Sequence, residues 1–187
     1  MQNLTNNMMS DFINSHLQLI DTNKSLLCLG KGKDGAEAIF FAELGLQIEV
    51  LDDSAEVLCE LMRKAQEIYK DIAIRHTFIT YWTPCENCYG TIVSAFFQIA
   101  KEEQTIMFEK IYTSLSKGGL FIGEFFSESQ PHYKSGGPNK DDRLYGLKNT
   151  SDNIKNLPFV VHKLSQEVIF LKDGKKASVI RIILEKK

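Results

Sequence analysis

The sequence predicts an α/β protein with a doubly wound, mostly parallel sheet that ends in an antiparallel β-hairpin. Apolar runs alternate with helical patterns through the first 126 residues, as repeated βαβ units require. A glycine-rich turn at residues 30–35 separates the first apolar run from a helical stretch. Near the end, two long β-prone segments are joined by residues 172–176, a hairpin signal. With 187 residues, 43% of them hydrophobic, we expect one domain, residues 1–187.

The first part of the chain is expected to begin with a helix that lies on the sheet. Ser10 can cap an amphipathic helix that runs to about residue 20, and residues 1–23 are taken as an N-terminal helix and cap. The following elements, in order, are a strand at 24–29, a helix at 35–44, a strand at 48–51, a helix at 54–69 and a strand at 72–78.

The second part repeats the alternation and then changes to consecutive strands. The expected elements are a strand at 89–96, an amphipathic helix at 101–116, a strand at 120–126, a short helix at 150–156 and strands at 160–171 and 177–184. Residues 127–148 form the longest irregular stretch, and long loops in compact domains are often functional. We expect this loop to lie over the substrate side of the sheet.

The charge balance excludes several kinds of partner. The chain has 22 Lys and Arg against 24 Asp and Glu, so no nucleic-acid or acidic-membrane partner is expected. The N-terminus lacks a basic region followed by an apolar one, and no apolar stretch approaches the roughly 20 residues that cross a bilayer. We therefore expect a soluble, cytoplasmic protein. The sequence does not predict its oligomeric state.

The four cysteines allow more than one interpretation. Cys28, in a strand, and Cys59, in a helix, are expected to be small buried hydrophobic residues. Cys85 and Cys88 form a C-x-x-C pair. A redox pair of this spacing usually opens a helix, but a strand follows here, and a zinc site would need two further ligands. We favour an incidental loop pair over a redox pair, and predict no metal site.

The glycine-rich turn and a later carboxylate have the arrangement of a nucleotide cradle. Gly30, Gly32 and Gly35 admit positive φ and let a ligand approach the backbone closely. Asp52 follows the second strand about 20 residues later, where a carboxylate can accept hydrogen bonds from both ribose hydroxyls. Two alternatives remain: the turn only links strand to helix, or Asp52 only caps the next helix or forms an Asx turn.

Several segments together resemble the class I S-adenosylmethionine-dependent methyltransferases, especially the small tellurite-resistance and thiol-methyltransferase group. The segments that carry the resemblance are 30–35, 51–54, 89–94, 115–119 and 135–138 with 144–145. The resemblance implies a seven-stranded Rossmann-like methyltransferase fold whose last strand is antiparallel. It also implies methyl transfer from S-adenosylmethionine to a small molecule, with S-adenosylhomocysteine as the product.

The resemblance further implies a set of cofactor-binding residues. These are Gly30, Lys31, Gly32, Gly35, Asp52, Asp53, Phe78, Ile79, Phe96 and Phe97. The chain departs from the family at some positions. Where relatives commonly have an acidic residue, an Arg-Asn pair and a histidine, this chain has Cys28, Ala36-Glu37 and Gln98, and its glycine loop is one residue longer.

The acceptor pocket is expected beyond the carboxyl ends of the fourth and fifth strands, because open α/β sheets bind ligands there. It should include Phe97, Gln98, residues 124–126 and the long loop. Candidates to orient or deprotonate a substrate are Glu124, His132, Tyr133 and Tyr145. For each of the last three we favour a packing or surface role over a catalytic one. Glu124 is the better candidate, with a structural role as acceptor for backbone N–H groups of the following loop as its alternative.

Two rival hypotheses compete with methyl transfer. The first is a dinucleotide-binding Rossmann protein, which the glycines and Asp52 fit but the terminal hairpin does not. The second is a degenerate methyltransferase fold that binds a ligand or a protein without turnover, which the departures at Cys28 and Ala36-Glu37 favour. Stabilisation by adenosyl ligands against NAD separates the first rival, and a turnover assay separates the second.

Overall fold

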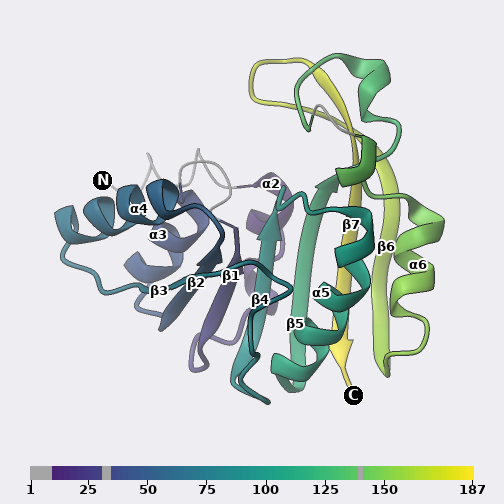
Figure 1. Ribbon diagram of the computed structural model, residues 1–187. Helices are drawn as coiled ribbons and strands as arrows, with labels where there is room; N and C mark the ends of the chain where they lie inside the picture. The colour runs from purple at the N-terminus through teal and green to yellow at the C-terminus, as the bar shows by residue number, and fades with distance from the viewer. Residues whose placement is uncertain (1–9, 31–34, 139–140) are drawn as a thin grey trace.

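The computed structural model describes residues 10–30, 35–138 and 141–187 and contains a seven-stranded sheet (Figure 1). The strand order is β3-β2-β1-β4-β5-β7-β6. Strands β1 to β5 pair in parallel, whereas β7 is antiparallel to both β5 and β6. The strands are β1 (Leu26–Leu29), β2 (Ile48–Asp52), β3 (Ala73–His76), β4 (Tyr89–Ala95), β5 (Leu115–Phe126), β6 (Phe159–Phe170) and β7 (Lys176–Lys186). The predicted fold class and its C-terminal hairpin are confirmed.

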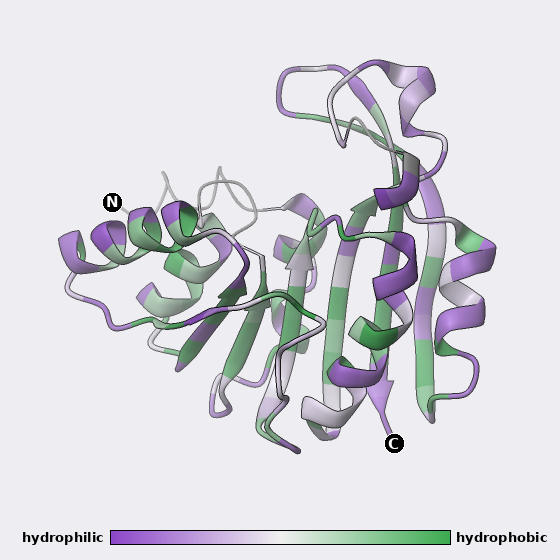
Figure 2. Cartoon of the chain, in the orientation of Figure 1, coloured by the Kyte–Doolittle hydropathy of each residue, from purple (hydrophilic) through white to green (hydrophobic). Residues whose placement is uncertain are grey.

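Helices cover both faces of the sheet. On one face lie α2 (Asp11–Asn14), α3 (Ala36–Glu43) and α4 (Ala55–Glu67), and on the other lie α5 (Lys101–Ser114) and α6 (Leu147–Ile154). Side chains of the central strands alternate between the two apolar clusters, as in β1, where Cys28 faces the first cluster and Leu27 the second. Figure 2 shows hydrophobic strands between helices whose outer surfaces are hydrophilic. Such double coverage is what a parallel sheet requires.

The N-terminal helix is shorter than predicted. Ser10 does cap α2, because its hydroxyl accepts a hydrogen bond from a backbone N–H of the first turn at 3.4 Å. The helix ends after one turn and is followed by the 3-10 helix η1 (Leu17–Leu19). The side chains of Ser15 and His16 each lie 2.8 Å from the carbonyl oxygen of Phe12, and such local hydrogen bonds compete with helix continuation.

The cysteines differ in part from the prediction. Cys28 is buried as expected, but Cys59 is exposed on α4, so that prediction was wrong. Cys85 and Cys88 are bonded as a disulfide in the turn before β4, rather than being an incidental pair. This turn precedes the amino end of β4, opposite the carboxyl ends of the parallel strands. Within the described part of the chain, every helix is too short or too polar to span a membrane.

Two segments project beyond the sheet at the carboxyl ends of the parallel strands: the loop after β5 and the β6–β7 hairpin (Figure 1). The loop contains two short 3-10 helices, η2 (Gln130–Tyr133) and η3 (Asp141–Arg143). The buried Gln130 side chain attaches it to β7, accepting from the Ser178 N–H at 2.7 Å and donating to the Gly136 carbonyl at 2.9 Å. The glycine-rich segment of the loop is thereby held against the sheet.

Candidate functional site

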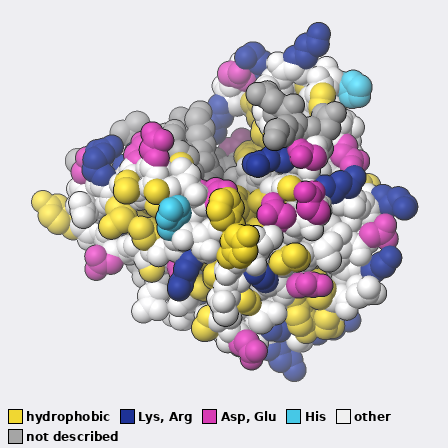
Figure 3. Space-filling model, viewed as in Figure 1, with side chains coloured by type: hydrophobic (Ala, Val, Ile, Leu, Met, Phe, Trp, Pro, Cys, Tyr) yellow, Lys and Arg dark blue, Asp and Glu magenta, His cyan; other side chains and the backbone are white. Residues whose placement is uncertain are grey.

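A cavity of about 880 Å³ opens at the carboxyl ends of the parallel strands, where ligands bind in open α/β sheets. Its walls come from the ends of β1, β2, β4 and β5, from the N-terminal residues Ser10 and Asp11, and from the β6–β7 hairpin. Figure 3 shows a notch between the part that carries α3 and α4 and the projecting loops, with charged side chains of both signs along its border.

The floor of the cavity at β1 depends on a glycine. Gly30 has a φ of +71°, and a Cβ placed there would lie 2.7 Å from the Phe97 ring. Gly35, with a φ of +73°, precedes α3, and its Cβ would lie 2.7 Å from the Leu61 side chain. Positive φ and close packing together require glycine at both positions. Gly30 and Phe97 line the cavity, and Gly35 lies at the start of the adjacent helix.

Asp52 ends β2 and lines the same cavity with 8% of its surface exposed. Its Oδ1 accepts a hydrogen bond from the Ser54 N–H at 2.9 Å. This is the Asx turn that the sequence left open as an alternative. The turn fixes the direction of the Asp52 side chain at the cavity wall, and a carboxylate can accept several hydrogen bonds.

Phe78 and Ile79 form a wall of the cavity next to Asp52, in a turn that Lys110 fixes. The Lys110 ammonium group, on α5, donates to the carbonyl oxygens of Ile79 at 2.8 Å and of Thr80 and Trp82 at 2.6 Å. Burial lowers the pKa of Lys110. Sequence reasoning missed this lysine, because it lies on a charged helix about thirty residues from the turn that it holds.

The centre of the cavity is formed by residues after β4. Phe96 has a positive φ of +56°, a strained conformation of the kind that clusters at functional sites. Its N–H donates to the Glu124 carbonyl at 2.7 Å, and its ring lies 4.6 Å from that of Phe126. The Gln98 side chain accepts from the Phe126 N–H at 2.9 Å and donates to the Arg143 carbonyl at 2.8 Å. Gln98 thus joins the long loop to the cavity.

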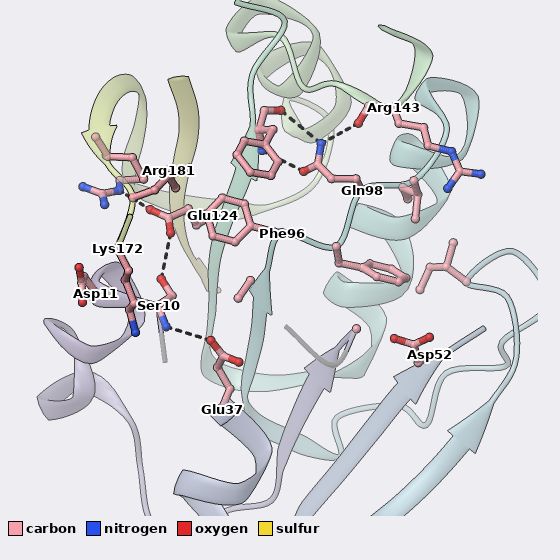
Figure 4. A pocket seen from close by; sticks show the side chains of 18 of the residues that line it. Ser10, Asp11, Glu37, Asp52, Phe96, Gln98, Glu124, Arg143, Lys172 and Arg181 are labelled. Atoms are coloured by element: carbon pink, nitrogen blue, oxygen red, sulfur yellow. Dashed lines mark hydrogen bonds and ion pairs between the residues drawn. The ribbon is translucent and has the colours of Figure 1, made fainter. Parts of the chain in front are cut away.

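Glu124 and Arg181 form an ion pair in the far wall (Figure 4). Glu124 is 2% exposed and accepts from Arg181 Nε at 2.7 Å and from the Ser10 hydroxyl at 3.0 Å. Burial raises the pKa of Glu124, and Arg181 and Ser10 act against this rise. Arg181 also donates to Glu167 at 2.9 Å. Among the described residues, the hydrogen bonds to the Glu124 carboxylate come from these side chains. They do not come from backbone N–H groups of the following loop, which was the alternative role considered for Glu124.

Glu37 is a buried carboxylate that the sequence did not single out as a site residue. It is 4% exposed, lines the cavity, and its Oε1 accepts from the Ser10 N–H at 3.0 Å. Within the described residues its Oε2 has no hydrogen-bond partner. Burial raises the pKa of Glu37, against the effect of the Ser10 N–H. The available signal in the sequence was that Ala36-Glu37 stands where the methyltransferases that the chain resembles often have an Arg-Asn pair.

The tip of the β6–β7 hairpin closes the cavity on the side of Glu124. The tip residues that line it are Ile169, Phe170, Leu171, Lys172 and Asp173. The sequence identified this segment as a hairpin turn but gave no sign that it faces a ligand site. Phe170 is 68% exposed, so the tip presents an apolar ring to solvent at the edge of the cavity.

Apart from Gly35 and Tyr145, which are described residues outside the cavity lining, the predicted site residues fall into three groups. Those that line one cavity are Gly30, Asp52, Asp53, Phe78, Ile79, Phe96, Phe97 and Glu124. Lys31 and Gly32 lie outside the described residues. His132, which is exposed, and Tyr133, which is half-buried, lie in η2 and outside the cavity lining.

Tyr145 is a packing residue rather than a pocket residue. It is fully buried, and its ring stacks on that of Phe125 with 4.1 Å between centroids. Its hydroxyl donates to the Phe97 carbonyl at 3.4 Å. Burial raises the pKa of Tyr145 well above the ordinary tyrosine value, which disfavours a role in proton transfer.

Comparisons with known proteins agree at the level of fold. No protein-family model and no curated protein matches the chain. A SAM-dependent methyltransferase from Methanosarcina mazei matches with a TM-score of 0.73 and 13% identity, over 95% of this chain and 98% of that one. Geranyl diphosphate C-methyltransferase from Streptomyces coelicolor, in complex with S-adenosyl-L-homocysteine, matches with a TM-score of 0.71 and 14% identity, over 95% and 76%.

TehB from Haemophilus influenzae matches with a TM-score of 0.73 and 14% identity. The match covers 95% of this chain, which spans only 62% of the length of TehB. Sequence identities of 13–14% support a shared fold and no more than that. The chain has the fold of the SAM-dependent methyltransferases, and the resemblance seen in the sequence is confirmed to that extent.

Proposed function

We propose that this chain binds S-adenosylmethionine in the cavity and transfers its methyl group to a small-molecule acceptor. The observation that carries the proposal is the convergence of Gly30, Asp52 and Phe78 on one cavity at the carboxyl ends of the strands. The bound S-adenosyl-L-homocysteine in the Streptomyces coelicolor neighbour supports it by analogy of fold. A cytoplasmic location and a single domain, residues 1–187, stay predictions.

The residues present suit the adenosyl group. Asp52 would accept hydrogen bonds from the ribose hydroxyls, and Phe78 and Ile79 would flank the adenine. At Gly30 the absence of a Cβ leaves the backbone open to the ligand, since a Cβ would strike the Phe97 ring. Asp53, Phe96 and Phe97 complete the proposed contacts among the described residues, and Lys31, Gly32 and Gly35 belong to the same proposal.

The acceptor would lie over the ends of β4 and β5. S-adenosylmethionine supplies a methyl group that its sulfonium already activates, so the main task of the protein is to align the acceptor and exclude water. Phe96, Phe126 and Phe170 give this half of the cavity apolar walls, and Glu124 with Arg181 gives it a polar end. We propose Glu124 as a group that orients the acceptor, since its ion pair holds it in place.

Calorimetric titration with S-adenosylmethionine and S-adenosylhomocysteine tests the cofactor site. We expect clear binding by the wild type and a loss of roughly ten- to a hundredfold in affinity for Asp52→Ala, because a charged acceptor of two hydroxyls is removed. Asp71→Ala, at an exposed position outside the cavity lining, is the matched control. NAD should give no heat. If neither adenosyl ligand gives a heat of binding at millimolar concentration, the proposal is contradicted.

A turnover assay separates the enzyme from a degenerate binding module. The protein is incubated with S-adenosylmethionine and a panel of thiols, oxyanions and amines, and formation of S-adenosylhomocysteine is followed. Turnover with any acceptor supports the enzyme, and the productive class identifies the acceptor chemistry. Adenosyl-ligand binding without turnover across the panel would favour the non-enzymatic alternative, which the departure at Cys28 also favours.

A further inference from the structure

We propose that Glu37 binds the α-ammonium group on the amino-acid portion of the adenosyl ligand. The first turn of α3 would then supply the carboxylate that relatives carry near the end of the first strand, where this chain has Cys28. The inference rests on the proposed cofactor site, and it concerns a residue that the family resemblance does not assign.

The first argument is the state of the carboxylate itself. Glu37 is 4% exposed, and the Ser10 N–H holds its Oε1 at 3.0 Å, which fixes the side chain against the cavity (Figure 4). Its Oε2 is buried and, among the described residues, receives no hydrogen bond. A buried carboxylate oxygen without a donor is costly. A ligand ammonium group would supply the missing donor and the opposite charge.

The second argument is position. Gly30, at the start of the glycine-rich turn, and Glu37, in the helix that follows the turn, line the same cavity. Burial, and after it the charge of Glu37, raises the pKa of the Cys28 thiol, so the carboxylate lies within electrostatic reach of Cys28. Carboxylates at both positions would repel each other in a buried site. A neutral Cys28 avoids a further carboxylate beside Glu37, which already lies within electrostatic reach of Glu124.

The third argument is the charge of the cavity. Among the described residues that line it, seven are acidic and three are basic, so its walls favour a cationic ligand. The acidic residues are Asp11, Glu37, Asp52, Asp53, Glu103, Glu124 and Asp173, and the basic ones are Arg143, Lys172 and Arg181. Arg181 pairs with Glu124. Lys172 acts on Glu37 through its charge, without a hydrogen bond to Oε2.

The experiment compares two ligands and two proteins by calorimetric titration. The ligands are S-adenosylhomocysteine and its deaminated analogue, which lacks only the α-amino group, and the proteins are the wild type and Glu37→Gln. We expect Glu37→Gln to bind S-adenosylhomocysteine about tenfold more weakly than the wild type does, as for loss of a charged hydrogen bond. The deaminated analogue should bind both proteins with equal affinity, close to that of Glu37→Gln for the parent ligand.

Glu56→Gln is the matched control, because Glu56 is also the second residue of its helix, is acidic and is exposed outside the cavity lining. It should bind both ligands like the wild type. Glu37→Met is a second variant that removes the charge with similar length, and it should repeat the pattern of Glu37→Gln. Thermal unfolding curves of all variants establish that each is folded at the titration temperature.

The outcomes separate this inference from the proposed function. Wild type that binds S-adenosylhomocysteine, with unchanged affinity in both Glu37 variants, overturns the role of Glu37 and leaves the cofactor site standing. An equal loss for both ligands in the variants also overturns it, because it indicates a general change in the cavity. Absence of S-adenosylhomocysteine binding to the wild type overturns the proposed function, and this inference with it.

Discussion

Glu37 gives the ligand-free protein a pH-dependent stability. Burial raises the pKa of Glu37 in the folded state above its unfolded value. The contribution of Glu37 to the stability of the fold is therefore fully present below the pKa of this group in the unfolded chain. It is lost as the pH rises through the pKa of Glu37 in the folded protein. Ionisation of the buried Glu37 carboxyl thus destabilises the apoprotein as the pH rises.

We expect Glu37→Gln to raise the melting temperature of the apoprotein at pH 8. A gain of about 1 kcal/mol corresponds to roughly 2–4 °C in a chain of this size. The gain should shrink towards zero at pH 4, where Glu37 is protonated. Thermal unfolding followed by circular dichroism at both pH values measures it, with Glu56→Gln as the control. A lower melting temperature for Glu37→Gln at pH 8 would contradict this account.

Arg181 balances the negative charge of a second buried carboxylate, that of Glu124. Its side chain is 18% exposed and pairs with Glu124 at 2.7 Å, so Arg181→Met would leave Glu124 buried and without its cation. We expect a loss of about 3–5 kcal/mol in the free energy of unfolding, measured by urea denaturation. Arg181→Met combined with Glu124→Gln should recover much of the loss, because the uncompensated charge is removed. A double variant as unstable as the sum of the single variants would contradict the pairing.

At the scale of elements, the turn at residues 78–82 depends on α5. Lys110 donates to three carbonyl oxygens of this turn, which forms the wall proposed for the adenine. We expect Lys110→Met to weaken S-adenosylhomocysteine and its deaminated analogue by the same factor, about tenfold. The equal effect on both ligands distinguishes this positioning role from that of Glu37. Unchanged affinity for both would show that the turn holds its conformation without Lys110.

The elements themselves were largely predictable, because hydrophobic periodicity and turn residues act over short distances. The β6–β7 hairpin and the helix at α5 followed from such local signals. The N-terminal helix was predicted too long, since the side chains of Ser15 and His16 compete locally for the Phe12 carbonyl. The β5 strand was predicted too short, because the glycines at 118 and 119 indicated a turn that the sheet incorporates.

At the scale of the whole molecule, the location of the site was predictable, but many of its hydrogen bonds and ion pairs were not. The alternation of strands and helices and the glycine-rich turn point to the carboxyl ends of the strands, where the cavity lies. The Ser10–Glu124 hydrogen bond joins residues 114 positions apart, and no local sequence pattern predicts such a contact. Tyr145 is a different case: the sequence allowed a substrate contact but favoured a packing or surface role, and the side chain packs in the core.

The cavity also depends on segments that the sequence separates widely. The N-terminal Ser10, the end of β5 and the tip of the β6–β7 hairpin meet around Glu124 only after the whole sheet has formed. This explains why the ligand side of the hairpin was not predicted. It also means that ligand binding should report on the complete fold rather than on its first half.

The most direct test of the account is a crystal structure of the protein with S-adenosylhomocysteine. We predict the ribose hydroxyls on Asp52, the adenine beside Phe78 and Ile79, and the α-ammonium group on Glu37 Oε2. Ligand density at this cavity with those three contacts would establish the cofactor site. Crystals grown at millimolar ligand that show the cavity without it, or the ligand bound elsewhere on the molecule, would contradict the central claim.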